Sequence, residues 1–331
     1  MRLASCKLSL FTSSLLRPTT TLRKFAPSFL AHIRKMSVLR KPVTIACVQL
    51  ASGADKAANL AHAREKVLEA AATGAGIVVL PECFNSPYGT SFFPQYAEVL
   101  TPSPPPAASA PSFAALSAMA RDAGVFLVGG SIPERDEASD KLYNTCLVFD
   151  PTGTLLASHR KVHLFDIDIP GKITFRESEV LTGGSAATVV DFPPYGRVSI
   201  AICYDIRFPA LAAIAARNDC FAFIVPGAFN MTTGPMHWRL LAQARAVDNQ
   251  MYTVLCSPAR DLNAGYHAWG HSLVADPMAT VMTEAEAEET IVTAQLTPGA
   301  LGDARSGIPV STQRRFDVYA NVAEGAKVVI S

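Results

Sequence analysis

Two stretches of the sequence repeat the same order of elements: an apolar strand, a helix, and a second apolar strand that ends at a proline. The first covers residues 43–81 and contains VTIACVQL, AANLAHAREKVLEAAATG and IVVLP; the second covers residues 197–226. Continuous runs of Val and Ile predict strands that are buried on both faces. Two such halves, stacked sheet against sheet with their helices outside, give an α/β fold of the α-β-β-α sandwich type. An ordinary doubly wound sheet is the alternative.

Further strand patterns connect the two halves. VFLVGG, NTCLVFD and TLLASHRKVH are short and apolar, and the DPTG between the last two is typical of a turn. The proline-rich segment 101–111 excludes a helix or a central strand, so we expect a surface loop that leads into a helix over residues 112–124. Apolar residues make up 49% of the chain and charged residues 17%, which is ample material for one large core.

The N-terminal region differs in charge from the rest of the chain. No Asp or Glu precedes Asp55, whereas Lys and Arg recur from Arg2 to Lys41, and the first 35 residues are rich in Ser and Thr. This composition predicts a mitochondrial transit peptide over residues 1–40, with an untargeted tail as the alternative. Because Met36 could serve as a second start, we expect a mitochondrial location, a cytoplasmic location, or both.

Charge, hydropathy and cysteine usage argue against several classes of protein. The formal net charge of +1 gives no electrostatic reason to expect nucleic acid as a partner. No run approaches the roughly 18 apolar residues of a membrane-spanning helix. The seven cysteines are odd in number and form no C-x-x-C pair, so we expect buried thiols, one of them reactive, rather than disulfides.

Three polar residues stand at or just after the ends of predicted buried strands. Glu82 closes IVVLPE, Lys161 closes TLLASHRK, and Cys203 closes RVSIAIC. Each residue alone more often has a structural role. A Glu at a strand end usually caps a helix or faces solvent in a loop, a Lys there is usually solvated, and a Cys in an apolar strand usually lies in the core. Open α/β sheets nevertheless gather their active sites at the carboxyl ends of strands, so the three together predict one site.

These three residue types are the parts that acyl transfer needs. A free thiol, with a pKa of about 8.5, is a weak nucleophile at neutral pH and needs a base or a nearby cation. Glu82 could take the thiol proton of Cys203 and then deliver it to the departing amine. Lys161 could lower the thiol pKa and stabilise the oxyanion, and the backbone N–H of Tyr204 is the natural second oxyanion donor.

The histidines offer weaker candidates for a metal site or a Cys–His nucleophile. The pairs His159–His163 and His267–His271 have the i,i+4 spacing that suits zinc on a helix. HRKVH follows a strand pattern, however, where we expect that spacing not to converge, and no H-E-x-x-H occurs. No His stands at a strand end where it would pair with Cys203. The sequence therefore predicts no metal site.

Four longer segments carry a family resemblance. PECFNSPYGTSFFPQYAE, HRKVHLFDIDIPGKITFRES, ICYDIRFP and PGAFNMTTGPMHW are similar to blocks of the nitrilase superfamily, and more narrowly of its Nit branch of omega-amidases. The resemblance spans residues 43–322, which predicts one carbon–nitrogen hydrolase domain there and a C-terminal tail over 323–331. It implies the same sandwich, a triad on Glu82, Lys161 and Cys203, Glu177 as a brace for the lysine, a homodimer, and no cofactor.

The resemblance also implies a substrate class. Omega-amidases release ammonia from the terminal amides of 2-oxoglutaramate and 2-oxosuccinamate through a cysteine thioester. A carboxylate on such a substrate needs cationic or donor groups, for which Arg207 and Thr232 or Thr233 are candidates. Arg207 could instead form a structural ion pair at the dimer interface. Phe84 and Tyr88 could wall the pocket or simply pack. Alternatives are a deaminated-glutathione amidase, a true nitrilase, or a non-catalytic binding scaffold.

Overall fold

The computed structural model describes residues 38–101, 103–171 and 173–331, so the predicted leader lies outside the described residues up to residue 37. Among them, seven strands form a first sheet in the order β15-β1-β2-β3-β5-β4, with β6 paired to β5. The central strands β1, β2 and β3 run parallel. The bounds are β1 (Val43–Gln49), β2 (Ile77–Val79), β3 (Phe126–Val128), β4 (Ile132–Asp136), β5 (Lys141–Phe149), β6 (Leu155–Arg160) and β15 (Thr290–Leu296).

A second sheet of seven described strands has the order β14-β13-β12-β11-β10-β9-β16. Its central strands β10, β11 and β12 also run parallel, as the repeated sequence pattern predicts. The bounds are β9 (Ala187–Phe192), β10 (Gly196–Ile200), β11 (Cys220–Pro226), β12 (Tyr252–Cys256), β13 (Leu273–Ala275), β14 (Val281–Glu284) and β16 (Val328–Ile330). A small separate pair, β7 (Asp166–Ile169) and β8 (Ile173–Arg176), precedes Glu177.

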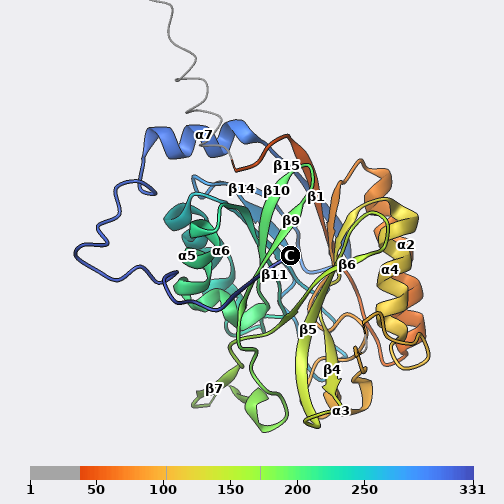
Figure 1. The fold of residues 1–331 in the computed structure, drawn as a ribbon. Helices are drawn as coiled ribbons and strands as arrows, with labels where there is room; N and C mark the ends of the chain where they lie inside the picture. The colour runs from red at the N-terminus through yellow and green to blue at the C-terminus, as the bar shows by residue number, and fades with distance from the viewer. Residues whose placement is uncertain (1–37, 102, 172) are drawn as a thin grey trace, which may run out of the picture. The chain divides into compact units, whose positions relative to one another are not determined.

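Helices cover the outer sides of the two sheets (Figure 1). α2 and α4 lie side by side along the first sheet, and α5 and α6 lie along the second, so the predicted α-β-β-α sandwich is confirmed. The described helices are α2 (Lys56–Ala72), α3 (Phe93–Tyr96), α4 (Pro111–Ala123), α5 (Pro209–Arg217), α6 (Gly234–Asn249) and α7 (Pro298–Gly307), with single 3₁₀ turns η1 (Glu177–Glu179) and η2 (Cys203–Arg207).

The alternation of side chains along β1 explains why its sequence is apolar throughout. Ile45 and Cys47 belong to the core that includes the second sheet, whereas Ala46 and Val48 belong to the core under α2 and α4. All four side chains are fully buried. A strand covered on both faces has no polar face to display, and this is the pattern that predicted the sandwich.

Local signals set the ends of the outer helices. Asp55 accepts a hydrogen bond from the backbone N–H of Ala58 and caps α2. α4 begins at Pro111, where a missing N–H costs nothing, and is capped after Ala123 by Gly124, whose φ of +66° suits a residue without a Cβ. The proline-rich segment ahead of α4 is thus a loop as predicted, within the residues that are described.

The folded domain is longer at both ends than the predicted range of residues 43–322. Leu39, assigned to the leader, is fully buried in the core, and the backbone N–H of Arg40 donates to the carbonyl of Tyr195. The segment 323–331 is not a free tail, because β16 pairs in parallel with β9. Its run of three apolar residues was too short to predict a strand. No helix in the described ranges is long and apolar enough to cross a membrane.

Candidate active site

The predicted catalytic residues meet at the carboxyl ends of strands from both sheets. Glu82 follows β2 by three residues, Lys161 follows β6 directly, and Cys203 opens η2 after β10. Cys203 has a φ of +48°, a left-handed conformation that is unfavourable for a residue with a Cβ. Such strain clusters at functional sites, where the surrounding structure holds the residue in place.

Lys161 lies between two carboxylates. Its Nζ donates to Glu82 Oε1 at 3.0 Å and lies 2.9 Å from both carboxylate oxygens of Glu177. All three side chains are almost completely buried. Glu177 is itself held by the hydroxyl of Tyr88 at 2.9 Å and by the backbone N–H of Phe165 at 2.7 Å. The structure therefore brings Glu177 to the lysine that it was expected to brace.

The Glu82 carboxylate has two further donors that the sequence did not reveal. Asn144 Nδ2 donates to Oε1 at 2.8 Å, and the backbone N–H of Ala228 donates to Oε2 at 2.9 Å. The carbonyl of Ala228 accepts from the hydroxyl of Tyr266. These contacts join β5, the loop after β11 and the loop after β12 around one carboxylate, and fix its position.

The Cys203 thiol hydrogen-bonds with Glu82. Burial and the charge of Glu82 raise the thiol pKa well above its ordinary value, and the opposing pull of Lys161 does not reverse this. The charge of Lys161 lowers the thiol pKa in the expected direction, but burial and Glu82 outweigh it, so the mechanism needs Glu82 as a base. Gly227 lies so close that a Cβ there would be 3.0 Å from the Cα of Cys203.

Burial and the neighbouring charges shift the pKa values of Glu82 and Lys161 in opposite directions. Burial raises the pKa of Glu82 above its ordinary value, although the charge of Lys161 opposes the shift. Burial alone would lower the pKa of Lys161, but Glu177 and Glu82 outweigh it and hold the pKa well above its usual range. The site thus contains a permanent cation next to a carboxylate of enhanced basicity.

A buried carboxylate, Asp205, links the nucleophile turn to the segment after Lys161. It accepts the backbone N–H of Ile202 at 3.0 Å and that of His163 at 2.8 Å. The ring nitrogens His163 Nδ1 and His159 Nε2 lie 2.8 and 3.5 Å from its oxygens. Burial alone would raise the pKa of Asp205, but its interactions with the two histidines hold it well below its ordinary value.

The expectation that the HRKVH spacing does not converge is thus wrong. His159 lies on β6 and His163 just past its end, where the chain turns, so both rings reach Asp205. In the described part of the chain no group of three or more His, Cys, Asp or Glu side chains is arranged to hold a metal ion. The cluster instead ties Cys203 and Lys161 to a common anchor.

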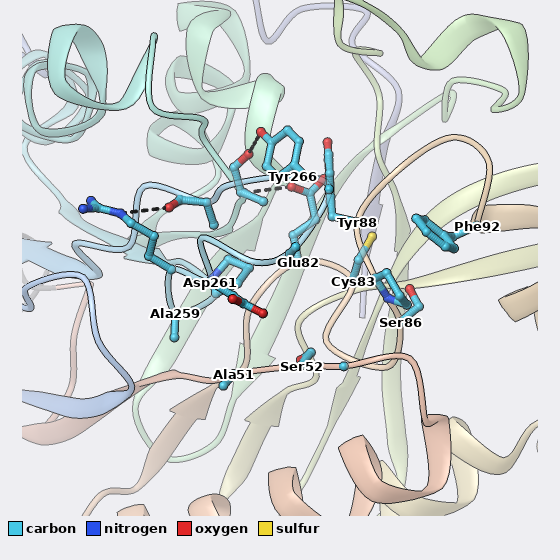
Figure 2. A pocket seen from close by; sticks show the side chains of 18 of the residues that line it. Ala51, Ser52, Glu82, Cys83, Ser86, Tyr88, Phe92, Ala259, Asp261 and Tyr266 are labelled. Atoms are coloured by element: carbon cyan, nitrogen blue, oxygen red, sulfur yellow. Dashed lines mark hydrogen bonds between the residues drawn. The ribbon is translucent and has the colours of Figure 1, made fainter.

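A cavity of about 720 Å³ opens beside Glu82, as Figure 2 shows. It is lined by the loops that follow β1, β2, β11 and β12, and its aromatic walls include Tyr88, Phe92 and Tyr266. The rings of Tyr88 and Tyr266 lie 4.4 Å apart between centroids. Burial raises the pKa of both phenols well above the ordinary value, and negative charge on Glu177, Glu82 and Cys203 adds to the shift.

Arg207 lies close to the nucleophile without a carboxylate partner. Its guanidinium contacts His237 Nδ1 at 3.1 Å and lies over the Phe229 ring at 4.7 Å. Burial lowers its pKa, and the charges that oppose the shift are those of Cys203 and Tyr204, with no Asp or Glu among the described groups that act on it. Among the described residues of this chain no carboxylate pairs with Arg207, and the ion pair considered for it at a dimer interface stays a prediction.

The remaining predicted binding residues differ in where they lie. The Tyr204 ring packs against Phe165 and Phe208 and lies 5.7 Å from the guanidinium carbon of Arg207. The backbone N–H groups of Thr232 and Thr233, and the hydroxyl of Thr233, all donate to Asn230 Oδ1. These groups hold the turn that starts α6.

The expectation that Phe84 walls the pocket is wrong. Its side chain is fully buried in the core beneath α2 and α4, and it does not line the cavity next to Glu82. The chain turns sharply at Cys83, which has a φ of +53°, so the residue after it points away from the site. Tyr88, by contrast, lines the cavity as expected.

Comparison with known proteins agrees with this geometry. The sequence pattern of the family described as "Carbon-nitrogen hydrolase" matches residues 44–306, most of the chain. This chain belongs to the carbon–nitrogen hydrolase family. It is therefore an amide hydrolase of the nitrilase superfamily, with relatives in the Nit branch.

Three relatives illustrate the similarity. The chain is 56% identical over 283 residues to "Hydrolase C26A3.11" of Schizosaccharomyces pombe, covering 86% of this chain and 85% of the relative. It is 52% identical to "Omega-amidase NIT2" of Danio rerio, covering 85% and 98%. It is 48% identical to "Omega-amidase NIT3" of Saccharomyces cerevisiae, covering 86% and 97%.

Solved structures share the fold of this carbon–nitrogen hydrolase. The crystal structure of Saccharomyces cerevisiae Nit3, described as a member of branch 10 of the nitrilase superfamily, has a TM-score of 0.77 at 45% identity and covers 84% of this chain and 98% of that one. The Caenorhabditis elegans NitFhit protein has a TM-score of 0.72 at 28% identity, covering 85% of this chain and 66% of that one.

Proposed function

We propose that the chain is an omega-amidase, which hydrolyses the terminal amide of short 2-oxo acid amides such as 2-oxoglutaramate and 2-oxosuccinamate to the dicarboxylic acid and ammonia. The observation that carries the proposal is the buried Glu82–Lys161–Cys203 arrangement beside Arg207, whose guanidinium has no carboxylate partner among the described residues. Relatives that bear the name omega-amidase, at about half identity over nearly their full length, support it.

The acylation step follows from the contacts of Glu82. Its carboxylate takes the thiol proton, and Sγ of Cys203 attacks the amide carbon of the substrate. The negative charge that develops on the carbonyl oxygen is stabilised by Lys161 and by the backbone N–H of Tyr204. Glu82 then gives its proton to the amide nitrogen and the C–N bond breaks. Ammonia is released, and the acyl group remains on Cys203 as a thioester.

Deacylation uses the same groups with water in the place of the thiol. Glu82 takes a proton from the water, whose oxygen attacks the thioester carbon, and the C–S bond breaks as the proton returns to sulfur. Because Glu82 alternates between base and acid, its raised pKa suits both half-reactions. Lys161 stays protonated throughout, since two carboxylates hold its pKa high.

Arg207 is the proposed partner of the substrate carboxylate. A half-buried guanidinium without an internal carboxylate partner among the described residues favours an anionic ligand. Replacing it with Met should raise KM for 2-oxoglutaramate by about 10- to 100-fold, the range for one charge-assisted hydrogen bond. Steady-state kinetics test this, with propionamide as an uncharged substrate whose KM should change little.

A matched substitution separates this effect from a general loss of charge. Arg239 lies on α6 and pairs with Glu284 on the surface, so Arg239→Met should leave both KM values near those of the unmodified enzyme. If the KM values of Arg207→Met for the charged and the uncharged substrate equal those of the unmodified enzyme, Arg207 does not bind the substrate carboxylate.

The substrate assignment is tested by ammonia release from a short panel: 2-oxoglutaramate, 2-oxosuccinamate, deaminated glutathione, glutamine and a simple nitrile. The proposal expects the two 2-oxo acid amides to have the highest kcat/KM. Preference for deaminated glutathione would make the chain a deaminated-glutathione amidase with the same triad. Release from none of the five would favour the non-catalytic scaffold.

We further propose that two copies pair through the outer face of α6. Met236, Leu240 and Val247 are all at least 44% exposed and recur at spacings that share one side of a helix. The exposed Met278 lies nearby, because Gln243 of the same helix donates to the carbonyl of Ala279. An apolar surface of this kind on a polar helix is suited to a second copy of the chain.

Light scattering after size exclusion measures this association. Leu240→Glu places a charge in the proposed interface and should shift the mass from two chains to one. Leu262→Glu changes a comparably exposed leucine on the loop after β12 and should leave the mass unchanged. A single-chain mass for the unmodified protein would contradict the pairing.

A further inference from the structure

The hydrogen bonds of Glu82 leave its two carboxylate oxygens unequal. Apart from the bond with the Cys203 thiol, Oε1 accepts two hydrogen bonds, from Lys161 Nζ and from Asn144 Nδ2, whereas Oε2 accepts one, from the backbone N–H of Ala228. Each carboxylate oxygen has two lone pairs. Oε1 is therefore saturated, which leaves Oε2 as the oxygen that can accept the proton of the Cys203 thiol.

We propose that Asn144 is a positioning residue that confines the proton transfers of Glu82 to Oε2. Nδ2 of Asn144 occupies the second lone pair of Oε1, so a proton taken from Cys203 or from water is held on Oε2 and leaves from there. This inference rests on the proposed role of Glu82 as the base. It adds a residue that acts through Glu82 and does not itself touch the substrate.

The placement of Asn144 suits this role. The residue lies on β5, is 2% exposed, and accepts the backbone N–H of Lys161 on its own carbonyl at 2.8 Å. One residue of β5 thus holds the side chain of Glu82 and the backbone of Lys161. Its amide has one favourable orientation, because the reverse would set its oxygen against Oε1, acceptor against acceptor.

Loss of the Asn144 amide has two chemical consequences. Without Asn144 Nδ2, one lone pair of Glu82 Oε1 is free, so that Oε1 can also be protonated. The carboxylate also loses a donor that favours its charged form, so the pKa of Glu82 rises further above its ordinary value. A base with a higher pKa is protonated at higher pH, and the acid limb of the pH–rate profile must move upward.

The test is the pH dependence of kcat/KM for ammonia release by Asn144→Ala. We expect kcat to fall by about 10- to 100-fold, KM to change little, and the acid limb to move up by about one pH unit. Asn85→Ala is the matched control. Asn85 is also fully buried, its Nδ2 also donates one side-chain hydrogen bond, to Ser112, and its Oδ1 also has no partner among the described residues.

The control separates positioning from packing. Both substitutions remove a buried amide, so both should lower the melting temperature, but only Asn144→Ala should shift the acid limb. An unshifted limb with kcat within about twofold of the unmodified enzyme, or an equal shift in Asn85→Ala, would overturn the proposal.

A second variant covers failure of the first to fold. Asn144→Asp keeps the shape and replaces the donor with a carboxyl group that competes with Glu82 for a proton, so it should shift the acid limb upward at least as far. An unshifted limb there would also overturn the proposal. Ammonia release by the unmodified enzyme and its loss in Glu82→Gln test the proposed function separately, so that failure of Asn144 alone leaves the triad intact.

Discussion

Cys203→Ala is expected to lower the rate of ammonia release by at least about 10³-fold, because no thioester can form without the thiol. The substitution removes one sulfur from a buried position next to Gly227 and leaves the Glu82–Lys161–Glu177 cluster in place. KM should therefore remain measurable, if any residual rate is detected, and the melting temperature should change by only a few degrees. A coupled ammonia assay with purified protein measures the loss.

Two other cysteines make this test specific. Cys146→Ala alters a fully buried thiol in the core, and its activity should stay close to that of the unmodified enzyme. Cys83 is the informative rival, because it follows Glu82 directly and lines the cavity. Near-normal turnover in Cys203→Ala together with loss of turnover in Cys83→Ala would transfer the nucleophile to Cys83.

Lys161→Met is expected to abolish activity and to lower the free energy of unfolding by about 3–5 kcal/mol, the range for breaking a buried ion pair from one side. Met fills much of the same volume, but Glu82 and Glu177 would then face each other without a cation between them. Chemical denaturation at neutral pH measures the loss of stability, and the ammonia assay measures the loss of activity.

The pH dependence of that loss has a definite sign. Burial raises the pKa of Glu82 and Lys161 opposes the shift, so removal of Lys161 raises it further. A carboxyl group whose folded-state pKa lies above its unfolded value favours folding when protonated. That contribution is present at acid pH and is lost as the pH rises. The stability gap between Lys161→Met and the unmodified protein should therefore narrow as the pH falls.

A double substitution provides the control for charge. Lys161→Met with Glu177→Gln removes one of the two unpaired carboxylates, so it should recover part of the stability without any activity. Equal stability of Lys161→Met and the unmodified protein at neutral pH would contradict the buried ion cluster.

The parts of this structure that follow from local sequence were predictable. The apolar run of β1 packs on both faces, and the repeated strand–helix–strand order returns as the parallel centres of two sheets. Strand ends also sufficed to select Glu82, Lys161 and Cys203, because parallel strands bring their carboxyl ends to one edge. The structure places these three and Glu177 together.

The parts that depend on long-range partners were not predictable. Asn144 stands in a run that reads as an ordinary strand, and its contact with Glu82 spans 62 residues of sequence. Tyr266 reaches Ala228 from a loop without regular periodicity. Phe84 was misplaced because the left-handed turn at Cys83 sends it into the core. The sign of the thiol pKa shift likewise depends on burial that composition does not reveal.

The most direct measurement of the central claim is the mass of the protein quenched in acid during turnover of 2-oxoglutaramate. The proposed mechanism predicts that the peptide containing Cys203 gains the mass of the substrate less the mass of ammonia. Hydroxylamine should release this adduct, and the adduct should be missing in Cys203→Ala. Ammonia release at the full rate with the adduct on Cys83, or with every cysteine unmodified, would contradict it.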